Sequence, residues 1–211
     1  MIHLQKLAEP AVLVENGATW TAEFLRLRAA GIVTQSVRFR YRHPTIKERL
    51  REETSEKCAY CESKVSHVHP GETDHILPVS EKPELYVNWV NLTYVCSECN
   101  REKSNYFSDP EPLVNPYTDE PSDHLYFVGP LVLHRDAKGL RTQRQLKLSR
   151  TALVERKQEM LERINLLVHQ WNETGAGPTK DFLRDEILSY AEDRAEFAAT
   201  VRAYLRTIGL T

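Results

Sequence analysis

The chain has no long apolar run and no large excess of charge of either sign. Within its 211 residues, no apolar stretch approaches the roughly 18 residues that a membrane-spanning helix needs. No basic segment followed by an apolar one opens the chain, as a secretion leader would. We therefore expect a cytoplasmic protein. The 28 Lys and Arg residues nearly balance the 30 Asp and Glu residues, for a net charge of -2. This balance excludes a general basic coat for nucleic acid but not a local basic patch.

Cysteine is scarce, and its four copies fall into two pairs. Two residues separate Cys58 from Cys61, and two separate Cys96 from Cys99. Each pair can bind one metal ion through two thiolates, and the two pairs together complete a tetrahedral zinc site with no position left for water. Without a secretion leader, disulfides are less expected than a metal site. We therefore predict one structural zinc ion; the alternatives are four buried free thiols or a redox-active dithiol.

The hydrophobic pattern predicts an α+β amino-terminal part and a helical carboxy-terminal part. Basic and apolar residues alternate from Val37 to Arg42, which indicates a half-buried strand or an extended segment. Apolar residues spaced as on one helix face run from Leu153 to Trp171. The other expected features are a turn at Asn16-Gly17 followed by a helix to about Gly31, a helix at 45–57, an irregular loop at 107–123, a strand or two at 125–133 broken at Gly129-Pro130, a break at 175–178, and a last helix or helix pair at 179–208.

The segment between the cysteine pairs carries side chains suited to a divalent metal ion and a general base. Asp74 and His75 stand side by side before Pro78, which indicates a turn. Asn100 and Lys103 come after the second pair and would lie on a helix. Carboxylate and amide oxygens are ordinary ligands for a hard divalent ion, and a neutral imidazole is a suitable base near pH 7. An Asp-His pair alone is a weak signal, because most such pairs are surface residues.

The order of these motifs resembles the zinc-stapled branch of the HNH endonucleases, the ββα-metal nucleases. A first C-x2-C pair, Asp-His-Ile-x-Pro, Asn-Leu, and a second C-x2-C pair with Asn-x-x-Lys occur here between Cys58 and Lys103. The resemblance implies a ββα-metal core stapled by the four cysteines, with helical extensions at both ends. It also implies a metal-dependent endonuclease that hydrolyses phosphodiester bonds in DNA.

The same resemblance assigns a role to each motif residue. Asp74 and Asn100 would bind a catalytic Mg2+ or Mn2+ ion, and His75 would be the general base that activates water. Asn91 would brace the loop. Asn88 competes with Asn91 for this role, and Asn91 is preferred because Asn-Leu stands at the family's distance before the second cysteine pair. The last motif position is Asn rather than His, a variation that the family allows.

Softer signatures flank this core, including Trp20, Arg40-Tyr41-Arg42-His43, Asn115-Pro116 and Leu148-Ser149-Arg150. Their layout resembles the HNH nuclease subunit of the Septu anti-phage systems, a family also found beside some retrons. That family works with an ATPase of the ABC/SMC-like (RecF-like) type. The implied partners are such an ATPase subunit and a retron reverse transcriptase with its DNA. The chain departs from the family at two places, with Asp74 where Glu is frequent and Ser149 where Asn is frequent.

Basic residues close to aromatic ones form a candidate nucleic-acid contact. Arg38, Arg40 and Arg42 alternate with Phe39 and Tyr41, and such a patch can bind the phosphate backbone. A solvated surface is an equally good reading of the same residues. Lys103 is assigned to the nucleic acid as well, from its place in the motif.

The remaining histidines carry less specific expectations. His67 and His69 could add a metal ligand, although solvent-facing positions on a strand are favoured. His124 is expected to be structural. His134 and His169 are expected on the surface.

We divide the chain into an amino-terminal extension (1–57), a nuclease core with the following strands (58–147) and a helical region (148–211). The apolar face of the long helix in the last region is expected to dock the ATPase subunit, with packing on the final helices as the alternative. Two other functions fit the sequence. One is a non-catalytic, zinc-stapled module that binds nucleic acid, and the other is a stand-alone restriction-type nuclease.

Overall fold

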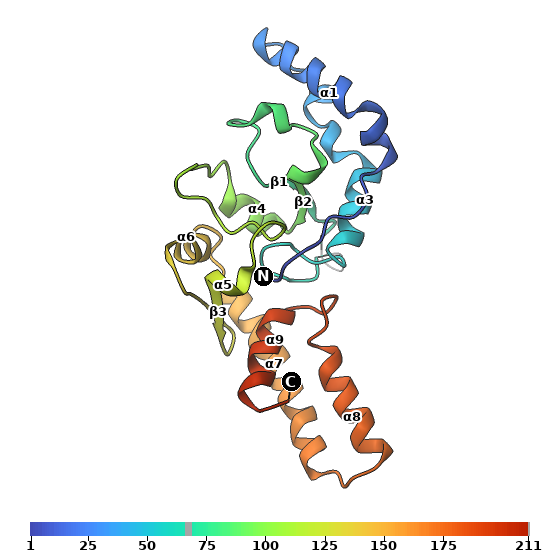
Figure 1. Cartoon of the computed structure of the whole chain (residues 1–211), viewed down its shortest axis with the longest axis vertical. Coiled ribbons are helices and arrows are strands. Elements are labelled where there is room, and N and C mark those ends of the chain that lie inside the picture. The colour runs from blue at the N-terminus through green and yellow to red at the C-terminus, as the bar shows by residue number, and fades with distance from the viewer. Residues whose placement is uncertain (66–68, 211) are drawn as a thin grey trace.

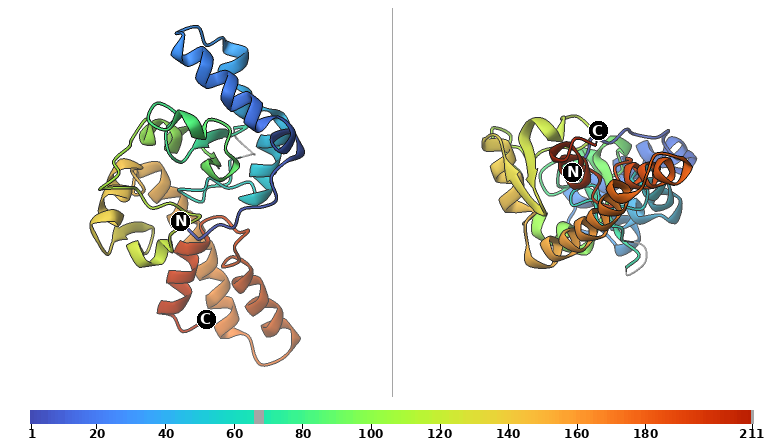
Figure 2. Two further views of the ribbon diagram at one scale, coloured as in Figure 1. Left: turned by 45° about the horizontal axis from the view of Figure 1, so that its top comes forward. Right: turned by 90° about the horizontal axis from the view of Figure 1, so that it is seen from below.

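The computed structural model describes residues 1–65 and 69–210. Figure 1 shows an elongated molecule with α1 at one end, two small sheets in the middle, and α7, α8 and α9 at the other end. The left view of Figure 2 shows the same order from another side. This α+β architecture with helical regions on both sides is the one that the sequence predicts. Among the described residues, no helix is long and apolar enough to cross a membrane.

Helix α1 (Ala11–Ala29) runs through the position where the sequence indicated a turn. The predicted turn at Asn16-Gly17 is wrong, because the Asn16 side chain donates to the carbonyl of Val12 one helical turn earlier (3.0 Å). Its polar group is thereby satisfied inside the helix. A single glycine costs a helix only about 1 kcal/mol relative to alanine, so Gly17 alone does not end it.

The segment Val37 to Arg42 is helical, and the expected strand or extended conformation is wrong. It forms α2 (Gln35–Arg38) and the short 3-10 helix η1 (Arg40–Arg42). Thr34 starts the first turn, since its Oγ1 accepts a hydrogen bond from Val37 N (3.4 Å). A six-residue alternation is too short to separate a strand from two helical turns when neighbouring elements supply the packing.

The core is a ββα unit. Strand β1 (Glu72–His75) pairs in antiparallel fashion with β2 (Leu92–Val95), and Asp74 lies opposite Thr93. Helix α4 (Ser97–Lys103) follows β2 and packs against β1. Strand β1, which carries Asp74 and His75, therefore lies beside α4, which carries Asn100 and Lys103.

Helix α3 (Pro44–Glu53) also packs against both strands of this sheet. Pro44 occupies the first helical turn, where its missing N–H costs nothing, and Ile46 and Leu50 are fully buried. The helix predicted at 45–57 is confirmed, with an earlier end. Two 3-10 turns, η2 (Pro83–Leu85) and η3 (Trp89–Asn91), lie between β1 and β2 in the chain.

His69 does not lie on the expected strand, since the described residues 69–71 just before β1 are not part of a strand. His69 is exposed, and its Nδ1 accepts a hydrogen bond from Gly71 N (3.0 Å). Gly71 has a φ of +64°, and a Cβ at this position would collide with the ring of Tyr94. This left-handed residue bends the chain just ahead of β1. His67 lies outside the described residues.

A second small sheet follows the irregular loop, as the sequence predicts. Strands β3 (Leu125–Val128) and β4 (Leu131–His134) form a hairpin that turns at Gly129 and Pro130. Short helix α5 (Pro121–His124) precedes it, and α6 (Ala137–Gln145) follows it.

The carboxy-terminal region is a helical arm made of α7 (Thr151–Glu173), α8 (Pro178–Ser189) and α9 (Ala198–Thr207). Much of the apolar face of α7 packs inside the chain. Ile164 and Val168 join residues of α8 and α9 in a separate apolar cluster. The final helices therefore take up most of the face that the sequence offered to a partner.

Candidate zinc site and nuclease site

The four cysteines come together in one cluster. The sulfur atoms of Cys58, Cys61, Cys96 and Cys99 all lie within 4.8 Å of one another. The Sγ atoms of Cys61 and Cys96 are 3.8 Å apart. Sulfurs bound tetrahedrally at about 2.3 Å from zinc would be separated by about 3.8 Å. The cluster therefore fits a structural zinc ion held by four thiolates.

Arg150, at the start of α7, contacts this cluster, and the buried Lys157 interacts electrostatically with two of its cysteines. The Arg150 guanidinium is 3.8 Å from Cys99 Sγ and 4.0 Å from Cys96 Sγ. Lys157, on α7, is 2% exposed, and its burial lowers the pKa of its ammonium to about 8 while Glu62 and Cys61 oppose this shift. A zinc ion with four thiolates carries two negative charges. These two side chains offer two positive charges to balance them.

Asp74 is buried at the sheet, with its carboxylate held by two side chains. Lys103 Nζ lies 3.1 Å from Asp74 Oδ2, and the Tyr60 hydroxyl donates to the same oxygen (3.2 Å). Burial raises the pKa of Asp74, and the ion pair with Lys103 opposes that rise. Burial also raises the pKa of Tyr60 well above its usual value, so this phenol remains a donor. Lys103, assigned by the sequence to nucleic acid, is itself buried and also donates to the His75 carbonyl (2.7 Å).

The ring of His75 has a defined protonation state. Its Nε2 lies 2.7 Å from the carbonyl oxygen of Tyr86. A carbonyl only accepts hydrogen bonds, so Nε2 carries the proton and the lone pair of the neutral ring is on Nδ1. Burial lowers the pKa of His75 to about 4. The imidazole is therefore neutral near pH 7 and has the form that a general base requires.

Asn91 bridges the loop that follows β1. Its Oδ1 accepts from Leu77 N (2.8 Å), and its Nδ2 donates to the Leu77 carbonyl (2.9 Å). Asn88, the competing candidate, instead accepts from Val90 N (3.1 Å) at the start of η3. Of the two asparagines, Asn91 thus contacts the backbone close to His75.

Asn100 lies half-buried on α4, and its Nδ2 donates a hydrogen bond to the carboxylate of Glu72. Asp74, His75, Asn100 and Lys103 all line one cavity of about 630 Å³. The structure thus brings together the Asp, His and Asn of the motif at a single hollow. Asn91 holds the loop beside it.

The three arginines of the candidate nucleic-acid contact are placed differently. Arg38 and Phe39 line the same cavity. The Arg42 guanidinium stacks over the Phe39 ring at 4.5 Å from its centre. Arg40 forms an ion pair with Glu23 (2.6 Å). Arg38 and Arg42 are therefore better placed than Arg40 to contact a phosphate.

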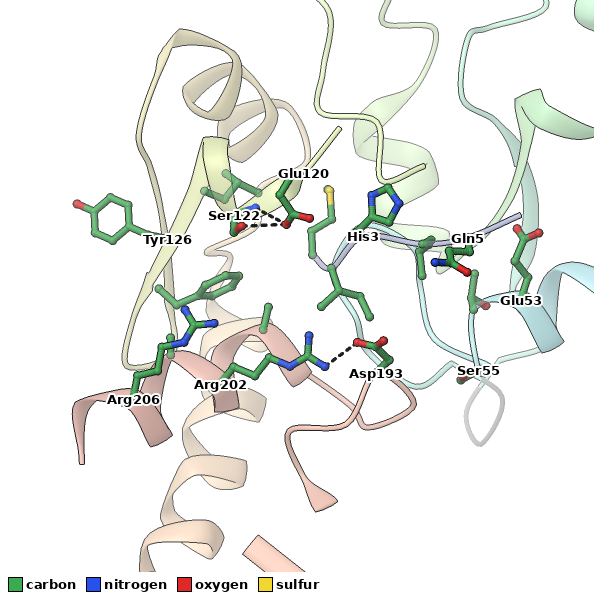
Figure 3. Close-up of a pocket in the computed structure, with 18 of the residues that line it drawn as sticks. His3, Gln5, Glu53, Ser55, Glu120, Ser122, Tyr126, Asp193, Arg202 and Arg206 are labelled. Atoms are coloured by element: carbon green, nitrogen blue, oxygen red, sulfur yellow. Dashed lines mark hydrogen bonds and ion pairs between the residues drawn. The ribbon is translucent and has the colours of Figure 1, made fainter. Parts of the chain in front are cut away.

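A larger cavity of about 720 Å³ lies elsewhere, between the first residues of the chain, β3 and α9. Figure 3 shows Arg202 and Arg206 on one of its sides, with Arg202 paired to Asp193 (2.6 Å). It contains none of the motif residues. The smaller cavity, and not the larger one, is therefore the candidate site, because it holds the motif residues.

Comparison with known proteins agrees with this geometry. A model of the HNH endonuclease family matches residues 58–106. The Septu protein PtuB of Bacillus thuringiensis is 31% identical over 222 aligned residues, which cover 97% of this chain and 82% of that protein. The chain belongs to the Septu PtuB family. Another Septu protein PtuB, from Bacillus mycoides (strain KBAB4), is 28% identical over 204 residues, covering 79% of this chain and 69% of that protein.

In this member of the PtuB family, the HNH match spans both cysteine pairs, β1, β2 and α4. Several residues at the two sites were not found from the sequence: Tyr60, Glu72, Tyr86 and Lys157. Glu72 had a local signal, since it lies two residues before Asp74 and so shares a strand face with it. The other three reach the sites through the tertiary fold, which a motif does not record.

Proposed function

We propose that this chain is a metal-dependent endonuclease that hydrolyses phosphodiester bonds in DNA. The observation that carries the proposal is the state of His75, whose neutral ring is held by the Tyr86 carbonyl with its lone pair on Nδ1. This base lines one cavity with Asp74 and Asn100. A buried structural histidine would not need a carboxylate and an amide beside it in an open hollow.

In the proposed reaction, His75 Nδ1 takes the proton of a water molecule that attacks the phosphorus. The carboxylate of Asp74 and the amide oxygen of Asn100 are hard donors, which suit Mg2+ or Mn2+. When bound, such an ion supplies positive charge that offsets the charge on the transition state and on the departing 3' oxygen. Tyr60 and Lys103 keep the Asp74 carboxylate in place. Asn91 keeps the loop after His75 in place through Leu77.

The DNA backbone is proposed to pass the cavity at Arg38 and Arg42. Arg38 lines the cavity, and Arg42 stacks on Phe39 beside it. A chain with a net charge of -2 has little long-range attraction for DNA, so local contacts of this kind have to supply it. Arg40 is committed to Glu23 and is expected to contribute less.

A plasmid assay tests the proposal. The purified, zinc-loaded protein is incubated with supercoiled plasmid and Mg2+ or Mn2+, with chelator as one control and Asp74→Ala as another. Metal-dependent nicking or linearisation that Asp74→Ala abolishes is the expected result. Binding of DNA without any cleavage, under every metal condition and with the partner present, would favour the non-catalytic zinc-stapled module instead.

We further propose that an ABC/SMC-like ATPase subunit is the partner of this chain in a defence complex. The relationship to the Septu protein PtuB supports a Septu-type assembly. The test is co-purification of this chain with the product of a neighbouring ATPase gene. Purification of an active nuclease alone, with no such gene beside it, would support a stand-alone restriction-type enzyme.

A further inference from the structure

The carboxylate of Glu72 lies next to the amide of Asn100. Glu72 begins β1 two residues before Asp74, so the two acids share one face of the strand. Helix α4 packs on that strand. Asn100 donates a hydrogen bond to Glu72, and Lys103 forms an ion pair with Asp74. Each of the two acids on this face therefore has a polar partner across the strand–helix contact.

An asparagine side chain has two chemically different ends, and its partner decides which end points where. An ionised carboxylate only accepts hydrogen bonds, so Glu72 requires the Nδ2 end of Asn100 to face it. The reverse orientation would bring two acceptors together and lose a charge-assisted hydrogen bond, a disadvantage of roughly 10- to 100-fold in population. The Oδ1 end of Asn100 is then directed away from Glu72.

We propose that Glu72 is a positioning residue, which fixes the Asn100 amide so that Oδ1, and not Nδ2, is offered to the catalytic divalent ion. This inference rests on the proposed function, in which Asp74 and Asn100 are the metal ligands. Asp74 needs no such control, because both ends of its carboxylate are oxygens. Its partners Tyr60 and Lys103 hold it in place without having to choose an end.

Mn2+ binding to the zinc-loaded protein without nucleic acid measures this effect directly. Electron paramagnetic resonance gives the Mn2+ affinity of the wild type, Glu72→Ala, Glu72→Gln and Asn100→Ala. We expect Glu72→Ala to weaken Mn2+ binding by about 10- to 100-fold, the range typical for groups that orient a metal ligand. Glu72→Gln is expected to lie between, because a glutamine amide can face either end of Asn100.

Glu98→Ala is the matched control. Glu98 lies on the same helix, but it is paired with the exposed Arg101 (2.5 Å), away from the Asn100 amide. Its substitution removes one acidic charge near the site and leaves Asn100 untouched. The Mn2+ affinity of this variant is expected to equal that of the wild type. Thermal unfolding of every variant checks that the fold is kept.

Repeating Glu72→Ala in an Asn100→Asp background separates orientation of the amide from direct ligation by Glu72 and from attraction of its charge for the ion. An aspartate offers oxygen at both ends, so it needs no orienting partner and is repelled by Glu72. We expect Glu72→Ala to leave Mn2+ affinity unchanged or to raise it in this background. A direct Glu72 ligand, or simple charge attraction, would instead weaken binding in both backgrounds when it is removed.

The inference is overturned if Glu72→Ala binds Mn2+ like the wild type, or if it weakens binding equally in both backgrounds. If Asn100→Ala itself leaves Mn2+ affinity unchanged, the ligand role of Asn100 in the proposed function fails, and this inference fails with it. Loss of binding in Asn100→Ala together with wild-type binding in Glu72→Ala overturns the positioning role alone. Loss in both, with no loss from Glu72→Ala in the Asn100→Asp background, supports it.

Discussion

The cysteine cluster and the cavity lined by Asp74 and Asn100 use the same short helix but hold their polar groups in different ways. Cys99 and Asn100 are neighbours on α4, and each belongs to one of the two sites. In the cluster, four sulfurs face one another, and the cations that balance them come from the helical arm. In the cavity, Asp74 and Asn100 are held by protein partners and line a space of about 630 Å³.

This difference separates a site suited to supporting the fold from the site that is proposed to carry out the chemistry. A metal ion with four protein ligands has no open position, so it contributes free energy to folding and none to a reaction. An ion with two protein ligands leaves positions for water and phosphate. Because one helix carries both sets, the first site fixes the place of the second.

The largest expected effect comes from removing one ligand of the cluster. Zinc binding in sites of this kind is worth about 10–16 kcal/mol near pH 7, which is comparable to the whole stability of a domain, about 5–15 kcal/mol. We expect Cys96→Ser to abolish cooperative unfolding of the core and to lower the zinc content from one ion per chain. Thermal unfolding and elemental analysis measure both. Ser97→Ala, one residue along, is the control, and a Cys96→Ser protein that melts like the wild type would contradict the zinc site.

Substitution of a cavity residue is expected to remove cleavage activity and to leave the fold intact, the reverse of the cysteine substitution. His75→Ala should reduce DNA cleavage by about two to four orders of magnitude, because the general base is lost. It should leave the zinc content unchanged and the protein folded, since Leu92, Tyr94 and Val95 of the core are fully buried by many other contacts. Cleavage rates and zinc content measured on one preparation test this together. Near-normal cleavage would remove His75 from the mechanism and point to His67 or His69 instead.

The cysteine cluster and parts of the fold follow from the sequence because their signals are local. Two C-x2-C pairs specify a metal site by spacing alone, and Gly129-Pro130 within the apolar run 125–133 marks the break between two strands. The roles of Asp74, His75 and Asn100 came from a resemblance, and they stay predictions.

What the sequence could not show are the contacts made across the fold. Tyr60 reaches Asp74, and Tyr86 reaches His75, from positions that no motif marks for these roles. The conformation of the segment from Val37 to Arg42 was predicted wrongly for a related reason. It depends on packing against Tyr86, whose hydroxyl donates to the Val37 carbonyl, and not on its own alternation of residue types.

Arg150 tests whether the cluster depends on charge from the helical arm. Its guanidinium lies beside two thiolates, and such neighbours typically change metal affinity by about 10- to 100-fold. We expect Arg150→Gln to speed zinc release to a competing chelator by about that factor. Arg156→Gln is the control, because Arg156 is exposed on α7 and pairs with Glu159 (3.1 Å). Equal zinc release from wild type and Arg150→Gln would show that the thiolates need no such balance.

The smallest expected effect concerns pH, and it belongs to the cavity. Burial lowers the pKa of His75 from 6.5 to about 4, so between these values the unfolded chain binds a proton that the folded chain does not. The stability that the neutral ring contributes is therefore complete above pH 6.5 and is lost as the pH falls toward 4. At pH 5 the loss is roughly 2 kcal/mol.

Urea unfolding of the wild type and His75→Ala measures this effect. Between pH 7.5 and 5, the free energy of unfolding of the wild type should fall by about 2 kcal/mol more than that of His75→Ala. His169→Ala, at an exposed position of α7, should keep the wild-type dependence. Both variants retain all four cysteines, so acid loss of zinc affects each protein alike and cancels in the comparison. Parallel curves for the wild type and His75→Ala would mean that the pKa of the ring is the same in the folded and the unfolded protein, and that burial does not keep the ring neutral below pH 6.5.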